Sequence, residues 1–540
     1  MFIKVTRSGK YEYVQLVSAY RENGVVKHKV LLNLGRLDQI ENNPSIQRLA
    51  VRLQELSRVK NRVDLSTFSE AQIVNWGYVV YRKIWQEFGL DHILGRIKEN
   101  GKIQFNLPDA CFLMVVQHLL EPRSKLGTYC HQNRYVNLPA VELHHLYRSL
   151  DILCEHKEEL EERLFHKNRH LFNMKVDVVF YDVTTFYFES VRADSLRDFG
   201  FNKDGKFKEV QVVLGLLIDC EGRPIGYELF PGHTFEGKTL EAVLEKLEKR
   251  FGLRRVILVA DRGINSKLNL KKIADKGYGY IFASRIKHLP RKIEEQVLAS
   301  EGYTEPDEEG FCYKVMDYTH KLRVDGKTHT LKEKLIITYS PARAKKDKAE
   351  RERLIAKARS LLEDKSQIKA SQKRGGRKYL QEVGGQDLDW VLDGEAIARD
   401  ERFDGYYGIQ TSEQDLSAQD VLDAYHNLWK IEESFRIMKS TLEVRPIFHW
   451  TENRIKGHFA MCFLAFLLER TLEFRLKKAG ETASPEQIRE ALNSMNFAEV
   501  KIENKRFLLK TKGTELGNRI LRLLKIKPPK NVIPIEELSI

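Results

Sequence analysis

The sequence lacks paired cysteines, long apolar runs and an acidic excess. Its six cysteines, at 111, 130, 154, 220, 312 and 462, form no CxxC pair, which argues against a zinc knuckle or a disulfide framework. They are typical of reduced thiols in a cytosolic protein. The longest apolar run, FAMCFLAFLL at 459–468, is about half of the roughly 20 residues that a bilayer span needs. We therefore expect a cytoplasmic protein without a membrane segment, in which this run is a buried core helix.

The first residues, MFIKVTRSGKYEY, do not resemble a signal peptide. The 540 residues predict roughly two to four domains, at about 100–200 residues each. Lysine and arginine number 90 against 76 acidic residues, a net charge of +14. A basic surplus of this size favours a polyanionic partner, of which nucleic acid is the commonest, although a merely basic surface remains open.

The hydrophobic pattern changes several times along the chain. Residues 1–43 alternate in short pieces, which predicts a small antiparallel β domain. Residues 44–170 have helical periodicity and predict either a DNA-binding module or a simple packing module. Residues 171–285 predict three antiparallel strands followed by alternating helix and strand, which gives an α/β fold with a mixed sheet and helices on its faces.

The remaining segments are more basic. Residues 286–420 break the earlier rhythm with further strands and with a stretch at 342–378 that holds 14 Lys/Arg against 5 Asp/Glu. We expect a basic helix there, followed by a flexible KRGGRK segment that contacts phosphates or is merely solvated. Residues 421–480 are helical again, and 481–540 form a basic C-terminal region.

Three carboxylates stand in unusual places. Asp182 lies within VDVVFYDVTTFYFES, a predicted strand that is apolar on both faces, where an unpaired carboxylate costs several kcal/mol. Asp261 closes the buried strand VILVAD. Glu432 shares one helical stripe with Tyr425 and Lys439, because the three are spaced by seven residues, or two turns.

A divalent metal explains this set. Carboxylate oxygens are the ligands that Mg²⁺ prefers, with Mn²⁺ as a substitute, and two ions about 4 Å apart support in-line phosphoryl displacement. Each acid also has a simpler interpretation that the sequence leaves open. Asp182 could bond to Thr184 or Thr185 at a bulge, Asp261 could begin a turn, and Glu432 could pair with Arg436.

Three segments also resemble a known family: FYDVTTFYFE, LVADRGINS and YHNLWKIEESFRIMKSTLEVRPIFHW. They are similar to the DDE transposases of bacterial insertion sequences, close to the IS4 and IS1634 groups, over residues 110 to 480. The third resembles the family pattern Y-x2-R-x3-E-x6-K. Tyr425, Glu432 and Lys439 keep the spacing, whereas Leu428 replaces the usual arginine, for which Lys430 or Arg436 could compensate.

The resemblance implies a ribonuclease-H-like core in two parts, 171–285 and 421–480, separated by a partly β insertion at 286–420. It implies that Asp182, Asp261 and Glu432 bind the metal, that Tyr425 and Lys439 hold phosphates, and that Trp390 holds a flipped base. The implied activity is two-metal cleavage and strand transfer at insertion-sequence ends. The implied partners are double-stranded DNA, at element ends and target, and a second copy in a synaptic homodimer associated with the nucleoid.

Two other functions remain open on the sequence. GHTFEGKT at 232–239 matches the P-loop pattern GxxxxGK[ST], in which Lys238 would hold phosphates and Asp261 would assist Mg²⁺ in an NTPase. Against this, the preceding segment IGYELF is predicted as the return arm of a hairpin, and bulky residues suit a phosphate cradle poorly. The other alternative is a catalytically inactive DNA-binding protein derived from a transposase.

Overall fold

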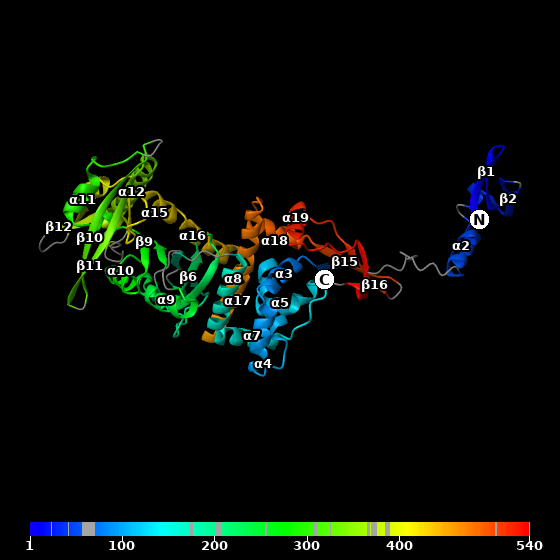
Figure 1. The fold of residues 1–540 in the computed structure, drawn as a ribbon, viewed down its shortest axis with the longest axis horizontal. Coiled ribbons are helices and arrows are strands. Elements are labelled where there is room, and N and C mark those ends of the chain that lie inside the picture. The colour runs from blue at the N-terminus through cyan, green and yellow to red at the C-terminus, as the bar shows by residue number, and fades with distance from the viewer. Residues whose placement is uncertain are drawn as a thin grey trace. The chain divides into compact units, whose positions relative to one another are not determined.

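The computed structural model describes residues 1–22, 24–40, 43–56, 71–172, 177–200, 208–253, 256–305, 310–324, 326–363, 368, 375–383, 389–502 and 505–538. The chain divides into two compact units. The smaller comprises Met1–Gln72, Glu499–Leu508 and Pro534–Glu537, and the larger comprises Ile73–Ala498, Leu509–Ile533 and Leu538–Ile540. Figure 1 shows the course of the chain through its helices and strands.

The first strands confirm the predicted small antiparallel sheet. β1 (Phe2–Ser8), β2 (Tyr11–Glu22) and β3 (Val25–Arg36) form an antiparallel sheet in that order. The turn between β1 and β2 uses Gly9 at φ 61°, a left-handed conformation that glycine adopts without steric cost. Two helices follow, α1 (Leu37–Ile40) and α2 (Pro44–Leu56).

A helical region follows, with one departure from the sequence prediction. Residues Gln72–Asn75, predicted as helical, form strand β4 in a four-stranded sheet ordered β17-β16-β15-β4. Hydrophobic periodicity failed here because four residues are too few to show a period. The helices are α3 (Val79–Glu87), α4 (Leu90–Asn100), α5 (Leu107–Leu120), α6 (Lys125–His131), α7 (Leu143–Glu155) and α8 (Lys157–Phe172).

Helix α17 (Glu452–Lys478) runs through the centre of this region and packs against α3, α5 and α7. Every residue of the run FAMCFLAFLL is buried, which confirms the predicted core helix. None of the helices, within the residues that the structure describes, is long and apolar enough to cross a membrane. At Gly457 the backbone of α17 comes so close to α7 that an added Cβ would lie 1.9 Å from the Leu150 carbonyl oxygen.

The central sheet has eight strands in the order β10-β11-β14-β9-β8-β5-β6-β7. β5 (Val178–Tyr187), β6 (Gln211–Asp219) and β7 (Pro224–Pro231) are antiparallel neighbours, as predicted. β8 (Ile257–Ala260) and β9 (Gly279–Ala283) run parallel to β5. The mixed α/β sheet is confirmed, and the order of β7, β6, β5, β8 and β9 is that of a ribonuclease-H-like core.

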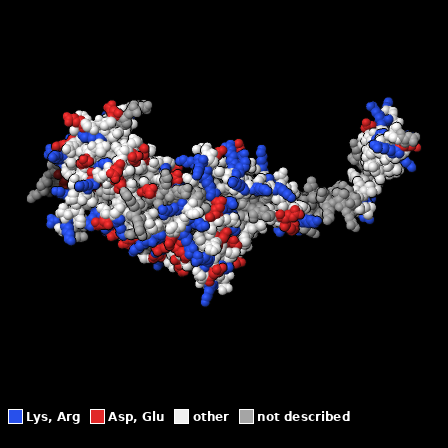
Figure 2. Space-filling view, viewed as in Figure 1, with Lys and Arg blue, Asp and Glu red and all other residues white. Residues whose placement is uncertain are grey.

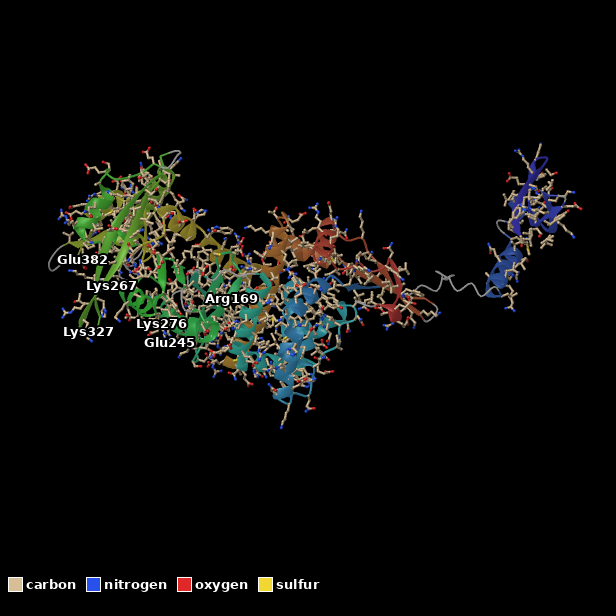
Figure 3. The ribbon with its side chains drawn as sticks, viewed as in Figure 1. Arg169, Glu245, Lys267, Lys276, Lys327 and Glu382 are labelled. Atoms are coloured by element: carbon tan, nitrogen blue, oxygen red, sulfur yellow. The ribbon has the colours of Figure 1, made fainter. Side chains whose placement is uncertain are left out.

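The segment predicted as an insertion extends this same sheet. β10 (Cys312–Val324), β11 (Lys327–Tyr339) and β14 (Tyr406–Thr411) add three strands next to β9, all antiparallel. The sequence shows the strands but not this pairing, since β14 joins β9 only after more than a hundred intervening residues. Lys267 and Lys276, at the two ends of α10 (Lys267–Asp275), and Lys327, at the start of β11, are exposed (Figure 3).

The rest of the segment forms helices and a two-stranded sheet of β12 and β13. The predicted basic helix is α12 (Pro341–Glu363), and it is accompanied by α11 (Arg291–Leu298), β12 (Leu380–Val383), β13 (Asp389–Leu392) and α14 (Gly394–Glu401). Part of the predicted flexible KRGGRK segment, 373–374, lies outside the described residues, and Gly375–Tyr379 form a short 3₁₀ helix. The C-terminal elements are α18 (Pro485–Asn493), β15 (Asn496–Ile502), β16 (Lys505–Lys510), α19 (Glu515–Leu523) and β17 (Val532–Pro534). Basic side chains gather over α18 and α19 (Figure 2).

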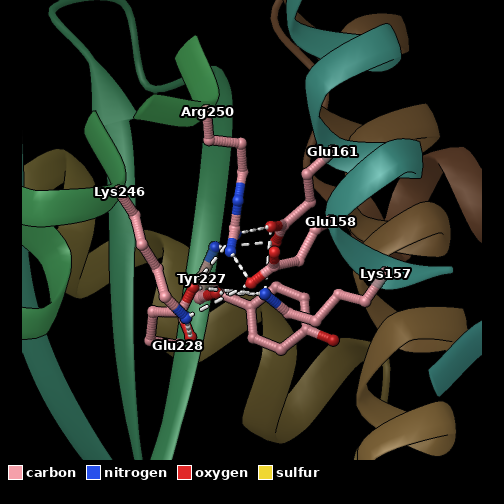
Figure 4. A network of polar contacts seen from close by, with 7 residues as sticks. All are labelled: Lys157, Glu158, Glu161, Tyr227, Glu228, Lys246 and Arg250. Carbon is pink, nitrogen blue, oxygen red and sulfur yellow. Dashed lines mark hydrogen bonds and ion pairs between the residues drawn. The ribbon is translucent and has the colours of Figure 1, made fainter. Parts of the chain in front are cut away.

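A buried charge network joins the helical region to the sheet (Figure 4). Lys157 and Glu161 of α8 pair at 2.9 Å, and Arg250 of α9 (Glu236–Phe251) contacts both Glu161 and Glu228 of β7. Lys246 reaches Glu228 at 2.5 Å. Buried charges of both signs satisfy one another here, so α8, α9 and β7 are fixed relative to each other.

The buried Glu469 of α17 should make the stability of the folded protein depend on pH. Burial and the neighbouring Glu473 raise the pKa of the Glu469 carboxyl to about 8, whereas its unfolded value is about 4.3. Since the folded pKa is the higher, its contribution to stability is complete below about pH 4 and is lost as pH rises towards 8, at up to about 1.4 kcal/mol per pH unit. Glu469→Gln should flatten this decline, measured by urea unfolding across that range, whereas the exposed Glu99→Gln should leave the slope unchanged.

Candidate metal and DNA site

Asp182 and Asp261 are brought together by the register of two parallel strands. Val178 lies opposite Ile257 and Phe180 opposite Val259 along β5 and β8. Continuing this register by two residues places Asp182 opposite Asp261, just beyond the end of β8 at Ala260. Neighbouring strands lie about 4.8 Å apart, and residues two apart on a strand point to the same face. The two carboxylates therefore lie side by side on one face of the sheet, at the level where β8 ends.

The sheet face that carries Asp182 is opposite to the face that packs against α9. Tyr181 and Val183, which alternate with Asp182, belong to a core cluster with residues of α9 and α10 (Lys267–Asp275). On the other face, the ring of Phe186 lies 5.3 Å from the ring of Phe459 in α17. Asp182 is half-buried, and its Oδ1 accepts a hydrogen bond from the Val183 backbone N–H at 2.8 Å. The carboxylate is thus oriented by its own strand.

Two helices and a π-helical turn cover this face: α15 (Ala418–His426), α16 (Trp429–Arg436) and η5 (Ile437–Thr441). Helix α15 packs against β8, β9 and β14, and α16 packs against β5. At one end, the Tyr425 hydroxyl donates to Asp261 Oδ1 at 3.4 Å. At the other end, the Lys439 ammonium lies 5.8 Å from the centre of the Phe186 ring. Both ends of the predicted stripe therefore reach the neighbourhood of the two aspartates.

Glu432 lies midway along this stripe and is exposed. The pairing with Arg436 that the sequence left open is not the one observed, since Arg436 lies 3.7 Å from Glu433, which also binds Arg470 at 3.2 Å. The Glu432 carboxylate forms no hydrogen bond or ion pair within the described part of the chain. No group of three or more His, Cys, Asp or Glu side chains among the described residues is already gathered closely enough to hold a metal ion.

Two predicted DNA contacts lie elsewhere. Lys430, on the opposite side of α16 from the stripe, donates to the Cys220 carbonyl oxygen at 2.5 Å in the turn between β6 and β7. Trp390 of β13 is half-buried against a small cluster around Tyr379 and is not among the residues lining the cavity next to the aspartates. The roles of Lys430 and Trp390 in binding DNA stay predictions.

A basic cavity of about 850 Å³ opens beside the aspartates. Thr184 of β5, Arg262 and Lys439 line it together with residues of the extended sheet. The guanidinium of Arg343 lies 4.2 Å from the centre of the Tyr407 ring, and Arg285 donates to the Arg262 carbonyl oxygen at 3.0 Å. Several cations of the wall face carboxylates: Arg343 lies 3.5 Å from Asp347, Lys287 and Lys378 pair with Asp400, and Arg351 pairs with Asp404.

Tyr407 links this cavity to the aspartate site. Its hydroxyl lies 2.7 Å from that of Tyr425, which itself reaches Asp261. Burial, Tyr407 and Asp261 raise the pKa of Tyr425, and burial raises that of Tyr407, so both hydroxyls remain protonated. Sequence reasoning missed Tyr407, Arg262 and Arg343. The signals were present, in the strand DGYYGIQTS and in the residue after Asp261, but only the pairing of β14 with β9 brings them together.

The P-loop interpretation of 232–239 does not agree with the fold. β7, which precedes the segment, is the edge strand of the sheet and is antiparallel to β6, whereas a P-loop follows a buried parallel strand. The Thr239 hydroxyl donates to the Glu236 carbonyl oxygen and accepts from the Tyr181 hydroxyl, both at 2.7 Å. It is therefore engaged in the core rather than available to a metal ion.

Comparison with known proteins gives two family matches. Residues 3–64 match the IS1634 family transposase N-terminal domain, and residues 175–468 match the transposase DDE domain. The second match spans more than half of the 540 residues. No curated protein matches the chain. Among solved structures it is similar to the piggyBac transposase in a synaptic complex with hairpin DNA, with 9% identity and a TM-score of 0.36 over 79% of this chain and 83% of that chain.

Proposed function

The chain belongs to the DDE transposases, and on that premise we propose that it cleaves DNA at the ends of an insertion sequence and joins them to a target. The observation that carries the proposal is the register of β5 and β8, which sets Asp182 opposite Asp261 where β8 ends. Glu432 completes the set because it lies between Tyr425 and Lys439, whose side chains reach the two ends of the site.

The donor set fits a hard divalent cation. Asp182, Asp261 and Glu432 offer only carboxylate oxygens, which suit Mg²⁺ or Mn²⁺, and movement of the exposed Glu432 towards the aspartate pair would complete the ligand set. When bound, the cation supplies the positive charge that favours a water nucleophile and stabilises the leaving oxygen. The Val183 N–H and the Tyr425 hydroxyl hold the two aspartates in orientation before any ion arrives.

The remaining groups position the DNA. Lys439, Arg262 and Arg343 point positive charge towards the cavity and bind backbone phosphates beside the scissile bond. In the first step, water forms a bond to phosphorus, the bond from phosphorus to the 3′ oxygen breaks, and one proton of the water passes to the released 3′ oxygen while the other passes to solvent. In the second step, the freed 3′ hydroxyl attacks a target phosphodiester and displaces another 3′ oxygen.

The assembly and place of action follow from the reaction. Two element ends must be held together with one target, so we propose that two copies of the chain form a synaptic homodimer on double-stranded DNA. Each copy presents one aspartate site to one end. The reaction takes place where the DNA lies, in the cytoplasm at the nucleoid.

Strand cleavage by the full-length protein tests this function. A duplex that carries an inverted repeat from the DNA flanking the coding region should be cut at the repeat boundary when Mg²⁺ or Mn²⁺ is added, and should stay intact in EDTA. A transferred product should appear when a target duplex is supplied. Tight binding of the same duplex with no cleavage under either metal would instead indicate a DNA-binding derivative that has lost catalysis.

Arg262→Gln tests the basic wall of the cavity. Arg262 is exposed beside Asp261, so its loss should not affect folding but should remove about one phosphate contact. We expect weaker binding of any duplex, with the slope of log affinity against log salt reduced by about one. Lys98→Gln, on helix α4, removes the same charge away from the cavity and should leave this slope unchanged. An unaltered slope in Arg262→Gln would exclude this residue from the interface.

A further inference from the structure

A second pocket, separate from the cavity at the aspartates, has a concentration of positive charge. It encloses about 340 Å³ between residues 122–127, which comprise the end of the α5–α6 connection and the first turn of α6, and residues 443–449, which follow η5. Both segments belong to the larger unit, and α17 contributes His458 to the wall. The pocket is therefore built where the helical region meets the end of the catalytic core.

Lys125 is the unusual group in this pocket. Its side chain is 3% exposed, and its ammonium has no hydrogen-bond or ion-pair partner among the residues that the structure describes. Burial lowers the pKa of Lys125 to about 8. A buried ammonium without a counter-ion costs several kcal/mol, a penalty that folds normally avoid. An anion bound in the pocket would remove this penalty.

Three neutral histidines surround Lys125. His118, His449 and His458 are buried, and burial together with Lys125 lowers the pKa of each, so these imidazoles are neutral hydrogen-bonding groups. The Nδ1 atom of His458 is buried without a hydrogen-bond partner among the described residues. His458 Nε2 lies 3.1 Å from the Val444 carbonyl oxygen and therefore carries the ring proton, so Nδ1 is an acceptor, and Lys125 is the group that attracts an anion.

Further charged groups lie at the edge of the pocket. Arg123 also lines the pocket and pairs with Glu121, which is in turn shared with Arg134. Among the described residues that line the pocket, Glu443 is the acidic one, and it is exposed. The interior of the pocket therefore carries the Lys125 charge, and the acidic groups lie at its margin.

The position of the pocket points to a nucleic acid strand. Arg445, on its wall, stacks 4.1 Å above the Tyr187 ring at the end of β5. Tyr187 is five residues beyond Asp182, which corresponds to roughly 17 Å along a strand. Phe448 and Trp450 are 60% and 68% exposed, while His449 between them is 6% exposed and faces the pocket. Exposed aromatic rings beside a cationic pocket form the pattern with which proteins hold unpaired strands.

We propose that this pocket binds a backbone phosphate of the DNA strand that leaves the aspartate site, and that Phe448 and Trp450 stack on its unpaired bases. The proposal rests on the proposed function for the identity of the strand. The phosphate chemistry of the pocket itself follows from Lys125 and its neighbours and does not depend on that function.

Lys125→Met tests the pocket, since methionine fills nearly the same volume without the charge. Inorganic phosphate should raise the melting temperature of the wild-type full chain relative to chloride at equal ionic strength. Lys125→Met should melt at a higher temperature than wild type without phosphate, should not respond to phosphate, and should bind DNA about tenfold more weakly. A purely structural lysine would not give higher stability together with weaker binding. Lys98→Gln should behave as wild type in both assays.

The stacking of the aromatic rings on unpaired bases is tested with two duplexes, one with an unpaired end and one with blunt ends. Phe448→Ala should weaken binding to a duplex with an unpaired end about tenfold and should affect a blunt duplex much less, since base stacking contributes about 1–3 kcal/mol per base. If Lys125→Met and the more conservative Lys125→Gln both keep wild-type DNA affinity, the pocket does not hold DNA, whatever their phosphate response. If the wild type binds phosphate and DNA through Lys125 but cuts no DNA, the proposed function fails and the pocket stands.

Discussion

Asp182→Asn is expected to lower metal-dependent strand cleavage about 10²–10³-fold or more, with little change in DNA binding. The amide keeps the shape of the side chain and its hydrogen bond from the Val183 N–H, but it removes the negative charge that attracts a cation. Asp261→Asn and Glu432→Gln should have effects of similar size, because all three carboxylates are needed for the same ions. Cleavage is measured on a labelled duplex under single-turnover conditions with Mg²⁺.

A neighbouring aspartate provides the control for this series. Asp177 is exposed just before β5, five residues ahead of Asp182 and outside the site. Asp177→Asn removes the same charge from the same segment and should cleave at the wild-type rate. If Asp182→Asn cleaved as fast as Asp177→Asn, Asp182 would be a structural residue and the catalytic assignment would be wrong.

Gly457→Ala should destabilise the protein strongly, although it adds only one methyl group. The new Cβ would lie 1.9 Å from the Leu150 carbonyl oxygen and 2.5 Å from its carbonyl carbon, both backbone atoms of α7. Since a backbone cannot rotate away as a side chain can, α17 and α7 must separate and lose apolar contact along their length. Such overpacking costs about 1–3 kcal/mol or more. Urea unfolding should show the shift in midpoint.

Gly95→Ala is the matched control. Gly95 is also inside a helix, α4, but nothing lies within 4 Å of the position of its missing Cβ. Alanine should therefore stabilise this helix by about 0.5–1 kcal/mol, because it loses less backbone entropy on folding. Equal effects of the two substitutions would show that the approach of α17 to α7 is not as close as the structure indicates.

Local signals in the sequence were sufficient to predict much of the core. The hairpin of β6 and β7 follows from CEGRP between two apolar runs, and the parallel strands β8 and β9 follow from their alternation with helices. Asp182 stood out because a carboxylate in a strand apolar on both faces needs a reason. Each of these inferences depends on residues that are close in the chain, where turn chemistry and hydrophobic period act directly.

The remaining features could not be predicted from the sequence because they depend on pairing between strands that are far apart in the chain. The register that sets Asp182 opposite Asp261 depends on how β5 meets β8, and no local pattern fixes it. β14 pairs with β9, which brings Tyr407 to Tyr425, although the sequence suggested a separate insertion. Lys125 could not be recognised either, since a lysine in EPRSKL gives no sign that tertiary packing will bury it without a partner.

The position of bound manganese tests the central claim most directly. Crystals of the full-length protein with a cleaved element end, grown with Mn²⁺, should give anomalous density at one or two ions. These ions should lie about 2.1–2.2 Å from carboxylate oxygens of Asp182, Asp261 and Glu432, close to the metal–oxygen distance of Mg²⁺. Density at the element end that touches none of these three carboxylates, or only one of them, would contradict the account.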